Sequence, residues 1–408
     1  MSDALSYLFS LEQFGIKFGL ENIFALVARL GHPERAFQSV HIAGTNGKGS
    51  VTAMVDAALR AAGHRSARFT SPHLVDITER FVIDGHPVSI DALIEVVAHI
   101  RGVVDALRTE GTLAVHPTFF EVTTAAAFEL FRRARVEVAV LEVGLGGRLD
   151  ATNVVTPIAT AITSIAFDHQ MYLGSTLAEI AFEKAGIIKP GAPVVIGELP
   201  HEAAEVVERV ARERGAEVIH ASAADVDGLA VGLRGTHQRV NAGVARRLLE
   251  VVDARGIAVP GTAIAAGLAQ PGWPGRLDER RLPDGRELLL DAAHNPAGAA
   301  ALASYLRAAN RLPAPLVFAA MRDKDIPGML AELLPVSSSF VATRAPLARS
   351  ADPETIAQHA RALAPMLPVA TAASTPDALA AAWCRAPRIV VAGSIFLLGD
   401  VLRHIEAA

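Results

Sequence analysis

The most constraining feature of the chain is a glycine-rich turn between an apolar run and a helical pattern, HIAGTNGKGSVTAMVDAALRAAG. Ser39–Ala43 predicts a buried strand, and Val51–Ala62 predicts a helix. Such a turn lets backbone N–H groups approach phosphate oxygens, and the helix N-terminus adds a favourable dipole. Strand, turn and helix in this order are typical of α/β sheets that bind nucleotides. The glycines of the turn are Gly44, Gly47 and Gly49.

The turn departs from the usual phosphate loop, in which Ser or Thr directly follows the lysine. Here Gly49 follows Lys48, and the hydroxyl comes one position later, at Ser50. Lys48 can neutralise β- or γ-phosphate charge, and Ser50 or Thr45 could reach a metal or a phosphate. The alternative is a structural turn that happens to hold a lysine. Guanine specificity has no support, because the sequence contains no N-K-x-D segment.

A carboxylate follows a second strand pattern. Glu142 lies near the end of the apolar run Val136–Val143, where open α/β sheets place ligand-binding groups. An unpaired buried charge is costly, so this carboxylate needs a partner. A bound Mg²⁺ would supply one, and a salt bridge to Arg148 or another cation is the alternative.

Two other strand patterns end in the same way. Asp168 and His169 follow the run Ile158–Ile165, where a metal ligand and a structural histidine are equally good interpretations. Ser71 follows the short run Arg65–Phe69, although a Ser-Pro turn explains it in isolation. These side chains extend the predicted magnesium site.

A lysine lies on a helix with a clear start signal. Thr176 and Glu179 form a capping box before Leu177–Ala185, which carries Lys184. An ammonium beside Mg²⁺ would be repelled, whereas a lysine carbamylated by CO₂ would be an anion able to bridge metals. The plain alternative is an exposed helical lysine.

Composition excludes several function classes. The chain has 408 residues, enough for two or three domains, and a net charge of −5, which gives no general attraction to nucleic acid or anionic membranes. Its single cysteine excludes an internal disulfide framework and a cysteine-based zinc site. No apolar run approaches the ~20 residues that span a bilayer, and the first residues carry no basic segment, so we expect a cytoplasmic protein.

The alternation of strand and helix patterns restarts after a segment rich in Pro, Gly and charge. We therefore predict domains over residues 1–275 and 276–408, an α/β architecture with a mainly parallel sheet in an N-terminal P-loop ATPase domain and a smaller Rossmann-like C-terminal domain. The further predicted strands are Pro193–Ile196, Leu288–Asp291, Leu316–Ala320, Phe340–Thr343 and Ile389–Ala392.

A set of motifs, in a fixed order, resembles one family. The segments GTNGKGS, TSPHL, ITERF, PTFFE, EVGLGGRLDATN, ITSIAFDH, EKAGIIK, HQRVNA, PGRLD, DAAHNP, MRDKDI and AGSIFLLGDV are similar to those of bacterial folylpolyglutamate synthase/dihydrofolate synthase, in the Mur ligase superfamily. The resemblance covers nearly the whole chain. In that family the phosphate loop normally reads G-T-N-G-K-G-[ST], which accounts for the shifted hydroxyl.

The resemblance implies a site for ATP and a magnesium site that holds two ions. It implies catalytic roles for Lys48, Lys184, His169 and Arg276, with Lys184 at the family's carbamylated position. The implied ATP-binding residues are Thr45, Asn46, Gly47, Lys48, Gly49, Ser50, Asn241 at the adenine end, Arg276 at the terminal phosphates and Asp291 at the ribose. The implied metal ligands are Ser71, Glu142, His169 and Lys184.

The resemblance also implies the substrates. The reaction joins L-glutamate to dihydropteroate and to reduced folates through an acyl phosphate, at the expense of ATP. The matching pterin-side residues are Ile16, Lys17, Phe18, Thr118, Phe119, Phe120, Glu121, Leu149, Asp150 and Ala151, and the weaker candidates for glutamate are His294 and Asp323.

Three other functions compete with this one. A member of the same family could carry only one of the two activities. A cell-wall Mur ligase would add an amino acid to a UDP-linked substrate, but only about 40 residues precede the phosphate loop, too few for a separate UDP-binding domain. A P-loop NTPase or kinase would turn over ATP without glutamate. We expect a monomer with small-molecule partners, no nucleic acid and no membrane.

Overall fold

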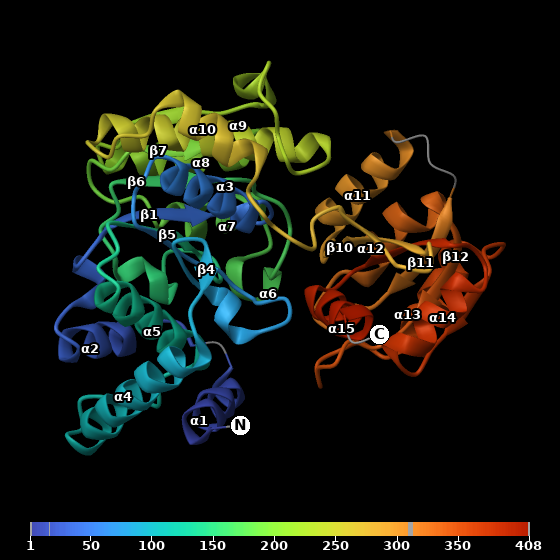
Figure 1. Ribbon diagram of the computed structural model, residues 1–408, viewed down its shortest axis with the longest axis horizontal. Coiled ribbons are helices and arrows are strands. Elements are labelled where there is room, and N and C mark those ends of the chain that lie inside the picture. Colours follow the sequence, from blue (N-terminus) through green and yellow to red (C-terminus); the bar gives the residue numbers. More distant parts are fainter. Residues whose placement is uncertain (1, 16, 309–312, 407–408) are drawn as a thin grey trace. The chain divides into compact units, whose positions relative to one another are not determined.

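The computed structural model describes residues 2–15, 17–308 and 313–406, and the chain forms two compact units (Figure 1). The N-terminal unit takes the chain up to Ile165, together with Ser175–Gly232 and Arg239–Pro271. The C-terminal unit takes Ala166–Gly174, Leu233–Gln238 and the chain from Gly272 onward. Two short segments that precede Gly272 in the sequence therefore belong to the second unit.

One large sheet organises the N-terminal unit. Its strands are β1 Gln38–Ala43, β2 Ser66–Phe69, β3 Phe81–Ile83, β4 His86–Pro87, β5 Val138–Glu142, β6 Ala159–Ile162, β7 Val194–Ile196 and β8 Val218–His220. Their order is β4-β3-β2-β5-β1-β6-β7-β8. The pairs β2–β3 and β3–β4 are antiparallel. All other neighbouring pairs of this sheet are parallel. From β1 the chain passes through α3 to β2 on one side, whereas β6, β7 and β8 follow on the other side. Such sheets bind ligands where the strand order reverses in this way.

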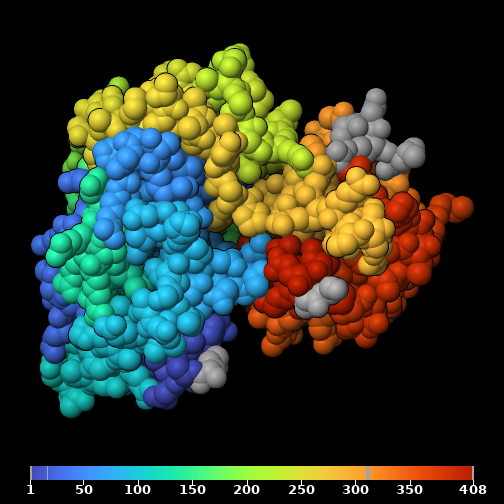
Figure 2. All heavy atoms as spheres, viewed as in Figure 1, coloured from blue at the N-terminus to red at the C-terminus, as the bar shows by residue number. Residues whose placement is uncertain are grey.

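Helices cover both faces of this sheet (Figure 1). They are α1 Asp3–Ser10, α2 Glu21–Arg29, α3 Lys48–Ala61, α4 Ile90–Thr109, α5 Phe119–Arg133, α7 Leu177–Ala185, α8 His201–Glu213, α9 Thr236–Ala254 and α10 Gly261–Ala269. Helices α3 and α10 pack together on one face, and their blue and yellow surfaces adjoin in Figure 2. Helices α4 and α5 pack together on the other face.

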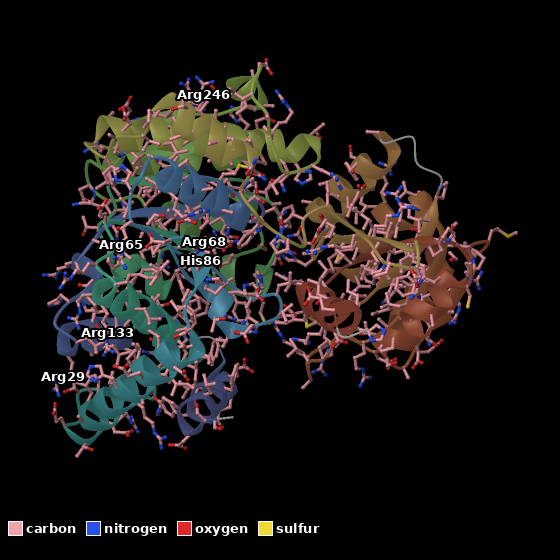
Figure 3. All side chains as sticks on the ribbon, in the orientation of Figure 1. Arg29, Arg65, Arg68, His86, Arg133 and Arg246 are labelled. Atoms are coloured by element: carbon pink, nitrogen blue, oxygen red, sulfur yellow. The ribbon has the colours of Figure 1, made fainter. Side chains whose placement is uncertain are left out.

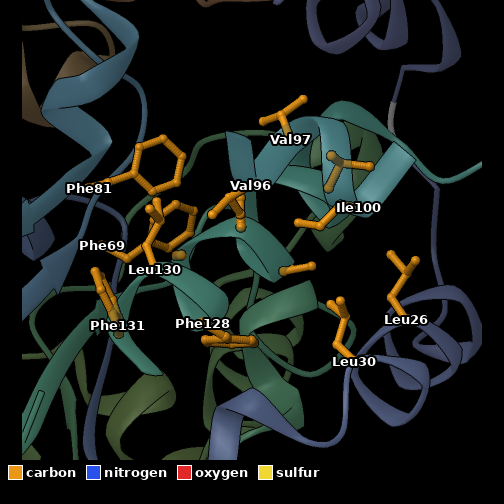
Figure 4. Packing of buried hydrophobic residues seen from close by; sticks show 14 of the residues in the cluster. Leu26, Leu30, Phe69, Phe81, Val96, Val97, Ile100, Phe128, Leu130 and Phe131 are labelled. Carbon is orange, nitrogen blue, oxygen red and sulfur yellow. The ribbon is translucent and has the colours of Figure 1, made fainter. Parts of the chain in front are cut away.

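Up to its last residue, strand β5 is an unbroken apolar run because both of its faces are buried, one of them in the core under α4 and α5. Ala139 and Leu141 point into this core, whereas Val138 and Val140 are buried on the opposite face. Phenylalanines from strands and helices fill its centre, and Figure 4 shows the side chains of Phe69, Phe81, Phe128 and Phe131 there.

Ion pairs hold the outer helices together. Arg133, labelled in Figure 3, bonds to Glu129 one turn earlier on α5, at 2.7 Å, and to Glu95 on α4, at 2.6 Å. A single guanidinium therefore joins two neighbouring helices.

The C-terminal unit has a sheet of its own. Its strands are β9 Asp278–Arg281, β10 Glu287–Asp291, β11 Ala314–Phe318, β12 Ser337–Ala342, β13 Val369–Thr371 and β14 Arg388–Ala392, in the order β13-β12-β11-β14-β10-β9. Only β9 pairs antiparallel among the described strands of this sheet. The helices are α6 Gln170–Leu173, α11 Pro296–Ala308, α12 Ile326–Leu333, α13 Pro353–Leu363, α14 Thr375–Trp383 and α15 Ile395–Glu406.

The predicted α/β class, with a mainly parallel first sheet and a separate second sheet, is confirmed. Several boundaries differ from the prediction by one to three residues, and two of them have a clear local cause. Helix α3 begins at Lys48 rather than at Val51, because Gly47 takes a left-handed conformation (φ 87°) and the helix starts directly after it. Strand β6 ends at Ile162, before the predicted Ile165, because the next side chains bond to the turn after β1.

No helix among the described residues is long and apolar enough to cross a membrane.

Candidate active site

Side chains from other segments pack closely against two glycines of the turn after β1. Gly44 (φ 153°) and Gly47 (φ 87°) both take backbone conformations that L side chains rarely adopt. A side chain at Gly44 would clash with the hydroxyl of Thr163, and one at Gly47 would clash with the amide of Asn241 on α9. Asn241 thus lies directly against the turn, and both glycines are required by conformation and by space.

Two lysines converge on one carbonyl of this turn. Lys48 Nζ donates to Gly44 O at 3.0 Å and to Thr45 O at 3.2 Å. Lys184 Nζ, from α7, donates to the same Gly44 O at 2.9 Å. The alternative of an exposed helical lysine is wrong for Lys184, because the residue is 4% exposed. The sequence separates these ammonium groups by more than a hundred positions, and the fold concentrates their charge beside a helix N-terminus.

Residues after β6 hold the turn from its other side. Thr163 Oγ1 donates to Asn46 O at 2.5 Å, and Ser164 Oγ donates to the same oxygen at 2.9 Å. The backbone N–H of Asn46 donates to Ser164 Oγ at 3.0 Å. Sequence reasoning missed these two supports, although their position at a strand's carboxyl end was the available signal.

Glu142 and Ser71 lie together at the ends of β5 and β2. The backbone N–H of Ser71 donates to Glu142 Oε2 at 3.3 Å, and Glu142 is 6% exposed. Arg148 pairs with Glu183, at 2.8 Å. Burial lowers the pKa of Arg80 to about 10, and the charge of Glu142 acts in the opposite direction on the same guanidinium.

The residues assigned to the pterin side fall into two groups. Thr118 and Glu121 form a capping box at the start of α5, with the Thr118 N–H donating to Glu121 Oε2 at 2.7 Å. This bond gives both residues a structural role. The guanidinium carbon of Arg80 lies 5.1 Å from the centre of the Phe119 ring. Phe120 fills the space beside Gly144.

Other pterin-side residues lie on loops. Lys17 pairs with Glu21 at 3.6 Å, and Phe18 is 48% exposed. Asp150 is buried and caps a short 3₁₀ helix, Ala151–Val154, directly after Leu149. Ile16 lies outside the described residues.

The C-terminal unit holds a second charged cluster. Lys324 Nζ lies 2.5 Å from Asp168 Oδ1 and 3.2 Å from His169 Nε2. Asn295 Nδ2 donates to Asp168 Oδ2 at 3.1 Å. Burial alone would raise the pKa of Asp168, but hydrogen bonding from His294 and the charge of Lys324 hold it well below its usual range.

The state of His169 follows from these contacts. An ammonium can only donate, so Nε2 of His169 accepts from Lys324 and the ring proton lies on Nδ1. Burial, with the charge of Lys324, lowers the pKa of His169 to about 4, so the ring is neutral near pH 7. In this arrangement Lys324 takes the lone pair that a metal would need.

A carboxylate lies at the carboxyl end of β10. Asp291 accepts from the N–H of Leu277, at 2.8 Å, and from the N–H of Ala293, at 3.0 Å. Burial raises the pKa of Asp291, and the charge of Arg276 opposes that rise. Asp323, the second glutamate candidate, is an exposed residue of the loop before α12.

Two family models match the chain. They are the Mur ligase middle domain, over residues 42–245, and the dihydrofolate synthetase C-terminal domain, over residues 279–404. The dihydrofolate synthase/folylpolyglutamate synthase of Bacillus subtilis is 36% identical over 379 residues, covering 85% of this chain and 87% of its own length. The chain belongs to the dihydrofolate synthase/folylpolyglutamate synthase family.

Solved structures of this family are similar throughout. Mycobacterium tuberculosis folylpolyglutamate synthase complexed with ADP has a TM-score of 0.90 and 34% identity, with 99% of each chain covered. The bifunctional folylpolyglutamate synthase/dihydrofolate synthase of Yersinia pestis complexed with AMPPNP and Mn ion has a TM-score of 0.85 and 30% identity, covering all of this chain and 98% of its own.

The residues of this dihydrofolate synthase/folylpolyglutamate synthase family member fit a nucleotide and a divalent cation. The turn after β1 has no room for side chains at two glycines and carries two ammonium groups, as a phosphate site requires. The buried carboxylate of Glu142 beside Ser71 offers the oxygen ligands that Mg²⁺ prefers. Within the described part of the chain no three His, Cys, Asp or Glu side chains form a group that could hold a metal ion.

Proposed function

We propose that the chain is an ATP-dependent ligase that adds L-glutamate to dihydropteroate and, in a second activity, to reduced folates. The observation that carries the proposal is the convergence of Lys48 and Lys184 on the Gly44 carbonyl of the phosphate loop, in a chain that matches this family along its length. Amide formation from a carboxylate needs ATP, because hydroxide is a poor leaving group and phosphate is a good one.

The chemical difficulty is electrostatic. An anionic folate carboxylate must attack the anionic γ-phosphate, and negative charge spreads over the phosphoryl oxygens as it does so. Lys48 offsets that repulsion at the phosphate loop, and Arg276 supplies a second positive charge. The glutamate α-amine then attacks the acyl phosphate, forming a tetrahedral intermediate that expels inorganic phosphate. The chain needs no nucleophile of its own and must only orient both substrates and exclude water.

Two Mg²⁺ ions would be held by four side chains, those of Ser71, Glu142, His169 and a modified Lys184. When bound, they neutralise phosphate charge and orient the transferring group. His169 would join them through a ring nitrogen. Because Lys324 contacts Nε2 at 3.2 Å, we propose that this contact rearranges when ATP binds.

Carbamylation of Lys184 is part of the proposal. As an ammonium the side chain donates to Gly44 O, and as a carbamate it would offer two oxygens to the cations beside it. Lys184→Ala should lose activity by about 10²-fold or more, with partial recovery in added formate or acetate. Lys184→Arg is the matched control, because it keeps a positive charge and cannot form a carbamate. Activity retained in the arginine variant would contradict the carbamate.

The remaining roles are assigned by position. Thr45, Asn46, Gly47, Gly49 and Ser50 would complete the phosphate cradle, with Asn241 at adenine and Asp291 at ribose. The pterin would meet residues 16–18, 118–121 and 149–151, and glutamate would meet His294 and Asp323. We further propose that residues 1–275 and 276–408 divide these tasks, in a cytoplasmic monomer.

Turnover with each pterin substrate tests the proposal. ADP release would be followed with dihydropteroate or tetrahydrofolate, each with and without glutamate. Release that requires glutamate with both substrates supports two activities, and release with only one substrate supports a monofunctional enzyme. ATP hydrolysis that ignores glutamate would instead favour an NTPase.

A further inference from the structure

A buried chain of hydrogen bonds runs from the strand that carries the phosphate loop to the loop assigned to the pterin. His41 Nε2 lies 2.8 Å from Thr152 Oγ1. Thr152 Oγ1 lies 2.5 Å from Asp150 Oδ1. All three residues are at most 5% exposed, so water does not compete for these bonds.

The direction of each bond follows from the inventory of protons. Burial raises the pKa of Asp150, but backbone N–H groups donate to both of its oxygens, from Thr152 at 3.0 Å and from Leu145 at 2.8 Å, and these bonds favour the ionised carboxylate as an acceptor. The single hydroxyl proton of Thr152 therefore points to Asp150, and Thr152 Oγ1 must accept from His41 Nε2–H.

The ring of His41 is thereby fixed in one tautomer. Nδ1 carries no proton, and within the described residues it is a buried atom without a hydrogen-bond partner. Burial, with the charge of Lys189, lowers the pKa of His41 to about 3, so the ring stays neutral at working pH. A fully buried histidine kept neutral, with one nitrogen unsatisfied, is costly as a packing residue, which points to the bond it donates.

The two ends of this chain of hydrogen bonds lie in different kinds of structure, a central strand and a loop. His41 lies in the central strand β1, paired in register with Leu141 on β5 and Thr160 on β6. Asp150 lies in the loop 144–154, whose bonds to Asp150 oxygens come from Leu145 and Thr152 within the same loop. Of these bonds, the one through Thr152 Oγ1 continues to the sheet. The loop is also held to α7 and the turn after it, by the Arg148 N–H to Glu183 O at 2.7 Å and by Asn153 Nδ2 to Gly186 O at 3.2 Å. His41 therefore fixes the end of the loop that carries Asp150 against the central strand.

We propose that His41 is a positioning residue for the pterin-bearing substrate, acting through Thr152 on Asp150 and the loop 144–154. This inference rests on the proposed function, because that loop is assigned to the pterin. His41 itself touches neither substrate nor nucleotide in this scheme. Its effect should appear in the KM for dihydropteroate rather than in the KM for ATP.

Thr152→Val removes the hydroxyl and keeps the shape. We expect the KM for dihydropteroate to rise about tenfold or more, with kcat and the KM for ATP changed by less than about threefold. Thr152→Ser restores the hydroxyl and should return the KM to within about threefold of wild type. Thr160→Val is the matched control, because Thr160 is a buried threonine beside His41 whose hydroxyl bonds to Pro193 O at 3.1 Å, outside the chain.

The other end of the chain gives an independent test. His41→Gln keeps a donor, whereas His41→Leu does not, so the KM for dihydropteroate should be lower in the glutamine variant. A KM that rises equally in Thr152→Val, Thr152→Ser and Thr160→Val would overturn the inference, as would equal rises in the KM for ATP and for dihydropteroate. Thermal melting curves confirm that each variant is folded. Wild type that fails to turn over dihydropteroate would overturn the proposed function as well, whereas an active wild type with an unchanged Thr152→Val overturns this inference alone.

Discussion

At the scale of single residues, Lys324 supplies the positive charge that keeps Asp168 ionised in a buried position. Both side chains are 9% exposed, and their charged atoms lie 2.5 Å apart. Removing one partner of such a pair leaves an uncompensated buried charge. The same ammonium contacts Nε2 of His169, so the protonation state of that ring also depends on this pair.

Lys324→Met should destabilise the C-terminal unit by about 3–5 kcal/mol, because Asp168 would lose its cation. Urea unfolding followed by tryptophan fluorescence measures this, since both tryptophans, Trp273 and Trp383, lie in that unit. Lys324→Arg keeps the charge and serves as the control. A methionine variant as stable as wild type would show that the pair contributes nothing.

Some of these residues could be predicted from sequence and others could not. Gly44, Gly47 and Lys48 belong to one short motif, so their role could be predicted from neighbouring residues in the sequence. Lys324 escaped notice because its partner Asp168 is 156 positions away, and a single lysine in a loop carries no local signal. The capping role of Glu121 was missed for the opposite reason: its motif was assigned to substrate although its spacing from Thr118 is that of a capping box.

At the scale of elements, α3 is fixed to the sheet by one buried carboxylate. Asp56, 0% exposed, accepts from Ser66 Oγ at 2.6 Å and from Arg68 at 2.9 Å, both on β2. The helix that begins at the phosphate loop is therefore tied at its middle to a neighbouring strand. Apolar periodicity predicted both elements, but not this bond between them.

Asp56→Asn should lower the free energy of unfolding of the N-terminal unit by about 3 kcal/mol, because Arg68 would lose its buried counter-charge. Asp84→Asn is the matched control: Asp84 pairs with Arg65 at 3.6 Å, both residues are about half exposed, and such pairs contribute about 1 kcal/mol or less. Urea unfolding followed by far-UV circular dichroism compares the two. Equal losses would contradict a special role for Asp56.

At the scale of the whole molecule, each unit contains histidines that stay neutral near pH 7, of which His41 is fully buried and the others are partly exposed. His41 lies in the N-terminal unit, and His169, His237 and His294 lie in the C-terminal unit. Burial lowers the pKa of His41 to about 3 and those of His169 and His237 to about 4, and it also lowers the pKa of His294. The composition of the chain could not predict this, because burial of a histidine is a tertiary property.

These histidines make stability depend on pH in a defined direction. The unfolded chain binds protons below about pH 6.5 while the folded chain does not, so the stabilisation is complete above that pH and is lost as pH falls toward about 4. Fully buried His41 should cost about 2 kcal/mol between pH 7 and pH 5, and the partly exposed histidines should cost less, because water screens their charge. The urea midpoint followed by far-UV circular dichroism should therefore fall over this range. A midpoint that rises as pH falls would contradict neutral burial.

The most direct test of the central claim is the product of one reaction. Dihydropteroate, ATP, Mg²⁺ and L-glutamate would be incubated with the protein, and the pterin product and nucleotide would be quantified by mass spectrometry. We predict a product heavier by one glutamate residue, joined through an amide, with one ADP and one phosphate formed for each bond. ATP consumption without that product, or no consumption at all, would contradict the assignment of this chain as a glutamate ligase.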